Sequence, residues 1–502
     1  MTLPARLIAP LVLALSAAPA MAQWSTATLS VPRTSPAGAS VGEKALFAGG
    51  FSAGVASDVV DIYDTSSGSW TTATLSSARG GISATTVGHK VYFAGGYVNP
   101  DRTGAVDTID VYDDSTGAWS TLALPSLSQN LWGYPIVALT AGHMALFSRD
   151  SDIDILDTQT GIWTTETMPF GNFHFPMTGA TLGAKAAFVS EDAVMRIYDA
   201  DAGTWTLVGS GLGGNSGPNG RPLPGRGPAS AFAGGDLICG GGERGCLWFG
   251  GSSSTQSAFL FDIGGNGFTT GGFTQGKSYL AATSTGNKAL FAGGAGQQCG
   301  VTYWRASVDI YDSATGAWTV SSLSAPRGYL AAATVGSLSL FAGGENDQGP
   351  SDVVDIYDES IGATYCSPAV INSTGQSAAI TAEGFPGSVA QGYVLLRASS
   401  LPPAALTLFL CSPTQGNATG PGGSQGTLCL GGAIGRFLGP AQIGPSSAAG
   451  IATLNVDLTQ LPRPGGAVAA QAGETWNFQA WYRDVNPGPT SNFTDAVSVT
   501  LQ

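Results

Sequence analysis

Two short segments, Leu46-Phe47-Ala48-Gly49-Gly50 and Val60-Asp61-Ile62-Tyr63-Asp64, decide the fold because both recur along the chain. The first returns at residues 92–96, 290–294 and 340–344, with variants at 146–148, 187–189 and 237–241. The second returns at residues 109–113, 153–157, 195–199, 258–262, 308–312 and 354–358. A tryptophan follows most of these second segments, at Trp70, Trp119, Trp163, Trp205 and Trp318. Seven units of about 40 to 60 residues predict a repeat architecture.

Each unit is expected to hold four short strands, named A to D in chain order. Strand A is a run of small and apolar residues such as 82–87, and strand B is the Gly-Gly segment. Strand C alternates with period two, and strand D begins at the tryptophan. Glycine in the C–D turn, as at residues 312–318, allows a positive φ. Four-stranded units arranged around a ring form a β-propeller.

The N-terminal segment is expected to close this ring. The seventh unit ends at residues 358–364 with no tryptophan and no fourth strand. Residues 24–30, Trp-Ser-Thr-Ala-Thr-Leu-Ser, match residues 70–76 almost letter for letter. The segment beginning at Trp24 therefore supplies strand D of the last blade, and residues 23–365 are predicted to form seven blades.

The repeated motif resembles that of the Kelch family of propellers. The Gly-Gly pair, the aromatic-Asp turn and the tryptophan at its offset carry the resemblance over residues 23–364. Units 3 and 4 lack the Gly-Gly pair, and Phe268 replaces the tryptophan of unit 5. The resemblance implies a seven-bladed Kelch-type propeller, and Kelch domains commonly bind ligands on the face that carries the D–A and B–C loops.

The repeat stops at Cys366, where a second domain is expected to span residues 366–502. Strand-like runs lie at 378–382, 393–398, 406–411, 428–430, 452–458, 476–482 and 496–501. About seven short strands in this length indicate a β-sandwich, so the whole chain is predicted to be all-β. Its opening CSPAVINSTG, LCLGGAIGRF at 428–437 and TWNFQAWYRD at 475–484 resemble a domain appended to large secreted bacterial proteins. That resemblance implies export and an accessory or sorting role.

Residues 1–22 have the pattern of a bacterial-type signal peptide. Arg6 precedes a short apolar run at 7–15, and Ala20-Met21-Ala22 is a cleavage pattern, so cleavage is expected after Ala22. No other stretch is long and apolar enough to predict a transmembrane helix. We therefore expect a secreted or cell-surface protein, and a monomer.

Composition excludes several classes of protein. The chain has 73 glycines among 502 residues and only 11% charged residues, which is incompatible with a helical bundle. The formal net charge is −14, and loss of Arg6 with the signal peptide makes it −15. A nucleic-acid binder needs a basic face, and an anionic membrane surface also attracts basic proteins, so neither is expected as a partner.

No catalytic constellation stands out, and we expect no metal and no cofactor. A Kelch propeller with a C-terminal sandwich also resembles galactose oxidase and its copper-radical relatives, which need a Tyr-His pair and a C-terminal His. This chain has neither, because no histidine follows His174. A turn such as 201–205 is a little like a sialidase Asp box, but the aromatic-Asp segments fit Kelch better, and no G-x-S-x-G motif occurs. Cysteine and histidine are not spaced as zinc ligands.

Candidate ligand-binding residues gather on the face that the D–A and B–C loops share. Arginines precede strand A of four blades, at Arg33, Arg79, Arg226 and Arg327. The long B–C loops of blades 5 and 6 carry Trp248, Tyr303 and Trp304, and Trp132 and His174 complete the set. Arginine can hold carboxylate or sulfate groups, and exposed aromatic rings can stack on sugars or anchor a protein. Alternatively, the arginines are fold residues that brace a neighbouring blade, and the aromatic rings and His174 are structural.

The six cysteines leave the disulfide pattern open. Cys246 and Cys299 lie at equivalent loop positions of neighbouring blades and are a plausible pair, while Cys239 is expected to pack as a small buried residue. In the sandwich, the family resemblance favours Cys366 with Cys429, and Cys411 with Cys429 is the alternative.

These features together predict a secreted, non-catalytic protein that binds a protein or carbohydrate ligand. A carbohydrate-active enzyme of unrecognised type and a purely structural envelope protein are the alternatives.

Overall fold

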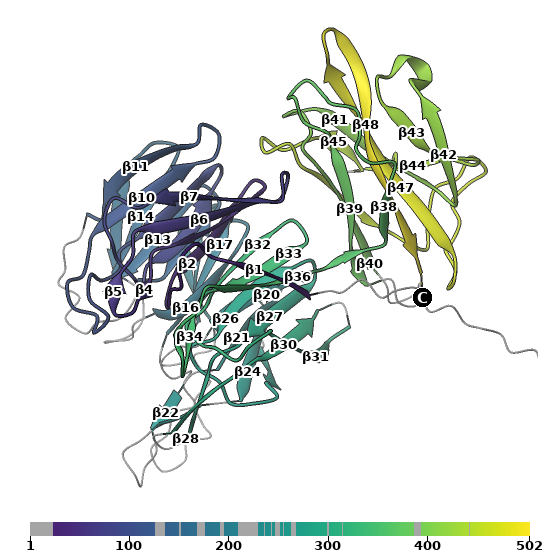
Figure 1. The fold of residues 1–502 in the computed structure, drawn as a ribbon. Helices are drawn as coiled ribbons and strands as arrows, with labels where there is room; N and C mark the ends of the chain where they lie inside the picture. Colours follow the sequence, from purple (N-terminus) through teal and green to yellow (C-terminus); the bar gives the residue numbers. More distant parts are fainter. Residues whose placement is uncertain are drawn as a thin grey trace, which may run out of the picture.

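The fold is all-β and consists of a ring of blades followed by a sandwich (Figure 1). This computed structural model describes residues 24–125, 136–149, 152–167, 176–190, 195–208, 229–234, 236–241, 243–245, 252–254, 256–262, 268–298, 301–313, 315–385, 393–440 and 442–501. The expected signal peptide at 1–22 lies outside these residues. Among the described residues, no helix is long and apolar enough to cross a membrane.

Seven four-stranded antiparallel sheets form the blades, as the repeat predicts. Blade 1 holds β2 (Ala37–Val41), β3 (Lys44–Ala48), β6 (Val59–Asp64) and β7 (Ser69–Thr74). Blade 2 holds β8 (Ser83–Val87), β9 (Lys90–Ala94), β10 (Thr108–Asp113) and β11 (Ala118–Ala123). Blade 3 holds β12 (Ala138–Ala141), β13 (Met144–Arg149), β14 (Asp152–Asp157) and β15 (Trp163–Thr167). Blade 4 holds β16 (Pro176–Leu182), β17 (Lys185–Ser190), β18 (Met195–Asp199) and β19 (Thr204–Val208).

The remaining blades complete the ring. Blade 5 holds β20 (Ala229–Ala233), β21 (Asp236–Gly240), β24 (Ser257–Asp262) and β25 (Phe268–Gly272). Blade 6 holds β26 (Ala281–Thr285), β27 (Lys288–Ala292), β30 (Ser307–Asp312) and β31 (Ala317–Ser322). Blade 7 holds β32 (Ala331–Val335), β33 (Leu338–Ala342), β36 (Val353–Asp358) and β1 (Trp24–Thr28).

The N-terminal strand closes the ring as expected. Strand β1 pairs with β36, and Trp24 lies opposite Tyr357. This is the register that Trp70 and Tyr63 adopt in blade 1. The ring centroids are 5.2 Å apart for Trp24 and Tyr357 and 5.1 Å apart for Trp70 and Tyr63. The two ends of the propeller are therefore joined within one sheet.

The propeller core lies between neighbouring blades. Leu46 and Ile62 of blade 1 pack in one cluster with Phe93 and Tyr112 of blade 2, and the tryptophan of strand D covers the edge of such clusters. Apolar residues on both faces of strands B and C thus face two different neighbours. This explains why these strands read as near-continuous apolar runs in the sequence.

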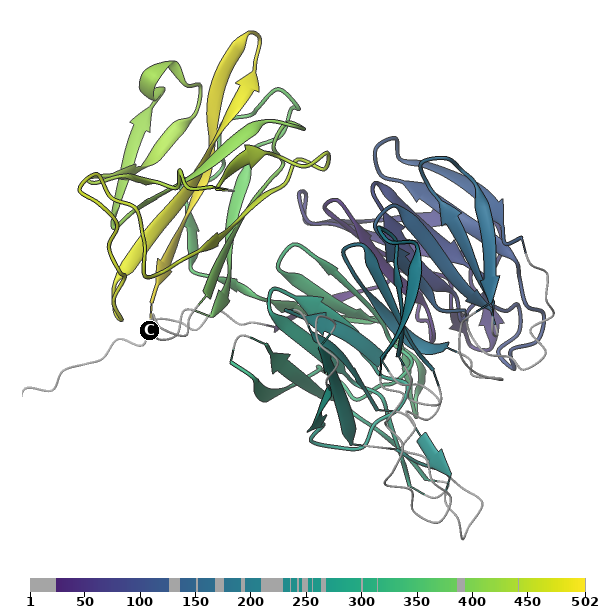
Figure 2. The same ribbon diagram turned by 180° about the vertical axis from the view of Figure 1, so that it is seen from behind.

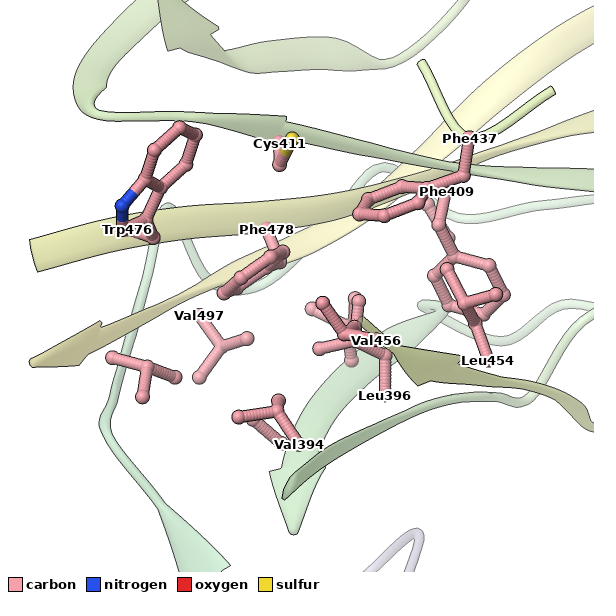
Figure 3. Packing of buried hydrophobic residues seen from close by; sticks show 14 of the residues in the cluster. Val394, Leu396, Phe409, Cys411, Phe437, Leu454, Val456, Trp476, Phe478 and Val497 are labelled. Carbon is pink, nitrogen blue, oxygen red and sulfur yellow. The ribbon is translucent and has the colours of Figure 1, made fainter. Parts of the chain in front are cut away.

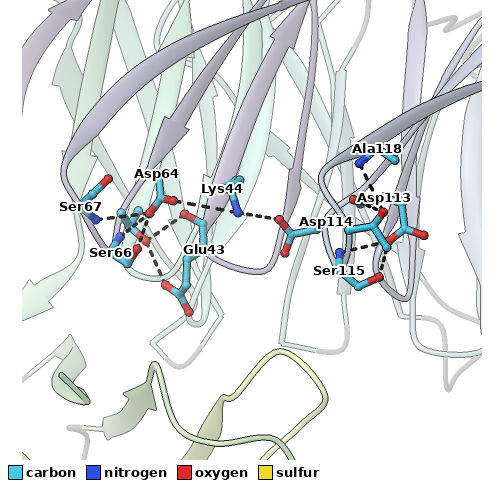
Figure 4. Close-up of polar contacts among 11 residues, drawn as sticks. Glu43, Lys44, Asp64, Ser66, Ser67, Asp113, Asp114, Ser115 and Ala118 are labelled. Atoms are coloured by element: carbon cyan, nitrogen blue, oxygen red, sulfur yellow. Dashed lines mark hydrogen bonds and ion pairs between the residues drawn. The ribbon is translucent and has the colours of Figure 1, made fainter. Parts of the chain in front are cut away.

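Polar contacts join blades at the C–D turns (Figure 4). Lys44 Nζ in blade 1 lies 2.7 Å from the carboxylate of Asp114 in blade 2 and 4.0 Å from that of Asp64. Asp64 accepts hydrogen bonds from the backbone N–H of Ser66 and Ser67. The aspartates that begin these turns therefore cap them, as expected for Asx turns.

Strands from two loops form an extra sheet beside blades 5 and 6. It comprises β22 (Glu243–Gly245), β23 (Ser252–Ser254), β28 (Ala295–Gln298) and β29 (Val301–Trp304), in that order. Two shorter hairpins, β4 (Phe51–Ser52) with β5 (Val55–Ala56) and β34 (Glu345–Asn346) with β35 (Gly349–Pro350), project from the B–C loops of blades 1 and 7. Figure 2 shows the propeller and sandwich from behind.

The C-terminal domain is a sandwich of two sheets. One sheet contains β37 (Ser360–Ile361), β39 (Ala379–Phe385), β40 (Tyr393–Ser399) and β46 (Ala452–Val456). The other contains β38 (Ala363–Tyr365), β48 (Pro489–Thr500), β47 (Thr475–Val485), β41 (Leu406–Ser412), β44 (Gly435–Arg436) and β45 (Ile443–Pro445). A hairpin of β42 (Thr414–Thr419) and β43 (Thr427–Gly431) lies beside them. The 3₁₀ turn η1 (Pro421–Gly423) connects its two strands.

Sandwich strands begin at Ser360 rather than at the predicted Cys366, because β37 and β38 pair with β39 and β48. Side chains from both sheets meet in one core, in which Phe409, Trp476 and Phe478 of one sheet face Val394 and Leu396 of the other (Figure 3). Arg397 of β40 lies 3.4 Å from Glu43 of the propeller, so an ion pair joins the two domains.

The cysteines of the sandwich pair as the family resemblance implied. Cys366 and Cys429 form a disulfide with a Cα–Cα distance of 6.3 Å, and Cys411 is a buried free thiol. Cys239 is also free and buried, as expected. Cys246 and Cys299 lie outside the described residues, so their pairing stays a prediction.

Candidate functional site at the channel mouth

The A strands enclose a channel along the axis of the propeller. A cavity of about 320 Å³ lies at the loop end, lined by residues that include Ala37, Ala84, Ala138 and Leu330. A second cavity of about 440 Å³ lies deeper among the same strands. Small side chains are needed here because seven strands converge on one axis. In blades 1 and 7 the approach is so close that a Cβ on Gly38 would meet the carbonyl oxygen of Ala332 at 2.4 Å.

Hydroxyl groups on the channel wall bind across blade boundaries. Thr85 and Thr140 have their hydroxyl oxygens 2.7 Å apart, and Thr283 and Thr334 show the same distance between blades 6 and 7. These hydroxyls satisfy one another at places where backbone pairing between neighbouring blades is absent. The described channel lining is therefore uncharged, mainly apolar at the loop end and richer in Ser and Thr deeper in the channel.

Three of the predicted arginines are buried beneath the loop face. Arg33, Arg79 and Arg327 have no exposed surface, and each forms an ion pair with the first aspartate of strand C in its own blade. The pairs are Arg33 with Asp61, Arg79 with Asp110 at 2.6 Å, and Arg327 with Asp355 at 2.6 Å. Lys277 takes the same position in blade 6 and lies 2.6 Å from Asp309.

Each basic residue fastens the D–A loop to its own blade. Arg79 donates to the carbonyl oxygens of Gly95 and Phe93 in strand B and its following turn. Asp110 also accepts from the backbone N–H of Ser76, which lies just after the last strand of the preceding blade. The side chains are therefore occupied in holding the D–A loop against their own blade.

The expectation that these arginines hold a ligand is corrected. A guanidinium group with no exposed surface and several internal acceptors cannot also chelate an external carboxylate or sulfate. The alternative interpretation holds for Arg33, Arg79 and Arg327: they are fold residues. Each braces its own blade rather than a neighbouring one. In blade 6, burial lowers the pKa of Lys277 while the charge of Asp309 opposes this shift.

Four candidates lie outside the described residues: Trp132, His174, Arg226 and Trp248. Their roles stay predictions.

Residues with positive φ lie at the channel mouth in the four blades whose D–A loops the structure describes. Ser35, Gly81, Tyr279 and Tyr329 each lie two residues after the buried basic residue of their blade, with φ values of 52°, 64°, 53° and 56°. Backbone hydrogen bonds link them in sequence around the ring. Tyr329 N donates to Tyr279 O at 2.9 Å, Ser35 N to Tyr329 O at 2.9 Å, and Gly81 N to Ser35 O at 3.3 Å.

Blades 6 and 7 place aromatic side chains on this ring. The rings of Tyr279 and Tyr329 stack with centroids 4.4 Å apart and planes 24° apart. Trp304, at the end of β29, meets Tyr329 with centroids 6.4 Å apart and planes 63° apart. Tyr303, the next predicted residue, is 47% exposed. Tyr303 is next to Trp304 in β29, so its side chain points to the opposite face of that strand. Tyr279, Trp304 and Tyr329 are called the mouth cluster below.

Polar groups hold the outer part of the mouth cluster. Trp304 Nε1 donates to the carboxylate of Asp347 at 2.7 Å, which links the B–C loops of blades 6 and 7. The guanidinium of Arg305 lies over the ring of Tyr303, 5.9 Å from its centroid. Leu330, adjacent to Tyr329, lines the channel cavity, so the cluster borders the opening of the channel.

In blades 1 and 2, the aromatic rings of the B–C loops are buried. Phe51 and Tyr97 occupy their B–C loops and are buried. The ring of Phe51 packs so closely on Gly80 that a Cβ there would lie 2.3 Å from it. Trp304 likewise lies over Gly328, 2.9 Å from a Cβ built there, but its ring and both tyrosine rings remain half-exposed. The mouth is therefore asymmetric within the described residues.

Sequence reasoning found Tyr303 and Trp304 but missed Tyr279, Tyr329 and Lys277. The two tyrosines precede strand A and resemble core residues in a linear reading. Their position in the repeat could have identified the two tyrosines, because Gly81 occupies the equivalent position in blade 2. A tyrosine where a repeat elsewhere has glycine indicates a strained backbone.

A match to one family model agrees with the propeller. A family model described as the Kelch motif matches residues 78–123, which cover most of blade 2. A solved structure titled "Structure of YjhT" is similar, with 16% sequence identity and a TM-score of 0.43, covering 59% of this chain and 98% of that chain. No curated protein matches the sequence. Among the described residues, no group of three or more His, Cys, Asp or Glu side chains could hold a metal ion.

Proposed function

We propose that this protein is a secreted, non-catalytic binding protein that recognises a ligand with the mouth cluster, Tyr279, Trp304 and Tyr329. The observation that carries the proposal is the pair of half-exposed tyrosines with positive φ at the opening of the channel. A bulky residue in this conformation costs about 1–3 kcal/mol and persists where the surroundings enforce it, which is common in ligand clamps.

Exposure of the aromatic rings is the second support. Aromatic side chains supply large contact areas at low entropic cost and dominate binding energies at interfaces. In blades 1 and 2 Ser35 and Gly81 take the places of Tyr279 and Tyr329, so the fold itself does not require an aromatic ring there. Selection for contact with a ligand accounts for the difference.

Export rests on the N-terminal sequence and on the disulfide. Residues 1–22 have the pattern of a signal peptide, and the Cys366–Cys429 bond is of a kind that persists in oxidising compartments. A monomer in solution is part of this proposal. A carbohydrate-active enzyme and a structural envelope protein are the alternatives that the following test separates.

The test uses the purified chain from residue 23 onward in pull-downs from extracellular material and on a glycan array. Trp304→Ala removes a half-buried ring of the mouth cluster, and Tyr303→Ala removes the exposed ring next to it in β29. Leu406→Ala is the control, because Leu406 on the sandwich is 45% exposed. We expect wild type and control to bind equally and the Trp304 variant to bind at least about tenfold more weakly, which corresponds to about 1.4 kcal/mol. Equal binding by all four proteins contradicts the site, and turnover of any polysaccharide contradicts a non-catalytic role.

A further inference from the structure

We propose that the ligand of the mouth cluster is an uncharged polysaccharide chain, an inference that rests on the proposed function. Three features of the described residues carry it: the arrangement of the aromatic planes, the carboxylate beside them, and the charge of the surrounding loops.

The aromatic planes form an open platform. Tyr279 and Tyr329 stack on each other, and both are half-buried, so they act as one block that is partly open to solvent. Trp304 stands at 63° to Tyr329 and adds a second surface of different orientation. A pyranose ring has an apolar face of C–H groups and a rim of hydroxyls, so it can lie on such a platform while its rim stays in water. Aromatic rings that are apolar on their faces and polar at one end suit this contact.

The geometry disfavours a small cation. Recognition of a quaternary ammonium group needs several ring faces directed at one point. Here the two stacked tyrosines direct one face of each ring at the other, so these two faces are closed to a cation.

Asp347 provides a fixed acceptor at the edge of the platform. Its carboxylate is exposed and is positioned by the indole N–H of Trp304 at 2.7 Å. A carboxylate has about four lone-pair sites, so one bond to the indole leaves capacity for hydroxyl donors. A sugar that lies on the aromatic rings presents hydroxyls of this kind at its rim.

Loop charge argues against an anionic ligand. In blades 1, 2, 6 and 7 the D–A and B–C loops expose or half-expose six acidic side chains and two basic ones. The acidic residues are Asp58, Asp101, Asp107, Glu345, Asp347 and Asp352, and the basic ones are Arg102 and Arg305. The other basic residues of these loops are buried in ion pairs. A negative potential around a binding face repels uronates, sulfated chains and nucleic acid.

The experiment compares neutral and anionic polysaccharides on one array. Tyr279→Gly/Tyr329→Gly removes the platform while keeping a backbone that tolerates positive φ. Ser35→Gly is the matched control, since it makes the same backbone change at the same ring position without loss of an aromatic ring. Thermal melting of each variant verifies that the propeller is folded.

We expect wild type and Ser35→Gly to bind one or more neutral glycans equally, and the double tyrosine variant to bind at least about tenfold more weakly. Asp347→Asn is expected to weaken binding severalfold. Preference for sulfated or uronic chains, or capture of a protein with no glycan bound, overturns the ligand class and leaves the proposed site standing if the tyrosine variant loses that binding. Full binding by the tyrosine variant overturns the site as well, and no binding to any glycan overturns this inference.

Discussion

Tyr329 of blade 7 stacks on Tyr279 of blade 6 with ring centroids 4.4 Å apart, while its backbone N–H donates to the Tyr279 carbonyl at 2.9 Å. Two adjacent blades are thus joined at the channel mouth by side chain and backbone together. Both residues have a positive φ, so the stack is held by a backbone conformation that tyrosine rarely adopts.

Backbone strain at Tyr329 has a measurable signature. Glycine adopts a positive φ without steric cost, whereas alanine does not. We predict that Tyr329→Gly is more stable than Tyr329→Ala by about 1 kcal/mol, since both lose the stack but only glycine relieves the strain. Denaturant midpoints measure the difference.

The control for this prediction is Tyr303, which lies in strand β29. There glycine is expected to be less stable than alanine by about 0.5–1 kcal/mol. The same order of stability at both positions, with alanine above glycine, would contradict strain at Tyr329.

Removal of a buried ion pair partner should be costly. Arg79 has no exposed surface and lies 2.6 Å from Asp110, so Arg79→Ala leaves a buried carboxylate without its charge partner. We predict destabilisation by about 3–5 kcal/mol, measured by chemical denaturation. Arg102→Ala, at an exposed arginine in the same blade, should cost less than about 1 kcal/mol. Similar losses in the two variants would mean that the buried pair does not fasten the loop.

Loss of the disulfide should destabilise the sandwich. Cys366 and Cys429 are 63 residues apart in sequence, and a bond that closes a loop of this length contributes about 4 kcal/mol. Replacement of both by serine is predicted to lower the free energy of unfolding of the sandwich by about that amount, measured by calorimetry. A shift of the propeller transition with no change in the sandwich would contradict this assignment.

The two free thiols should not react in the native protein. Burial raises the pKa of Cys239 to about 11 and that of Cys411 to about 12, so neither forms a thiolate near neutral pH. We expect iodoacetamide to label neither residue until the chain is unfolded. Labelling of Cys411 in the folded protein, detected by mass spectrometry, would show that the sandwich core opens.

The domain junction should weaken as pH rises. Glu383 in β39 is 3% exposed, and burial raises its pKa to about 7 from the usual 4.5, with Glu359 and Asp358 adding to the shift and Arg397 opposing it. Lys288 Nζ lies 2.6 Å from the carboxylate of Glu359, so its positive charge partly offsets the negative charge of these acidic residues. Because the folded state prefers protonated Glu383, the stability that this group contributes is fully present below about pH 4.5 and is lost as the pH rises through about 7.

Glu383→Gln tests this dependence. The variant should lose much of the decline in denaturation midpoint between pH 4.5 and 7, because glutamine cannot ionise. A smaller decline should remain, since burial also raises the pKa of Asp495 to about 6. An unchanged pH profile would exclude Glu383 as its source.

Periodicity explains what could be predicted of the fold. Strands B and C repeat because each face packs against a different blade, and residues 24–30 match 70–76 because both form the same strand in equivalent sheets. The sandwich boundary was less visible, since β37 and β38 are too short to produce a pattern.

The site was harder to predict because sequence does not show where a side chain points. Arg79 precedes strand A as a surface residue would, yet its guanidinium turns inward to Asp110. Tyr329 belongs to no sequence motif, and its positive φ and its stack on Tyr279 at the channel mouth are features of the structure alone. Trp304 was recognised because its loop is long and interrupts the repeat.

Calorimetric titration of a neutral oligosaccharide, chosen from the array, into wild type, Ser35→Gly and Tyr279→Gly/Tyr329→Gly tests the central claim most directly. The account predicts equal affinity for wild type and Ser35→Gly and at least about a tenfold loss for the double tyrosine variant. Equal affinity in all three proteins would contradict recognition by the mouth cluster.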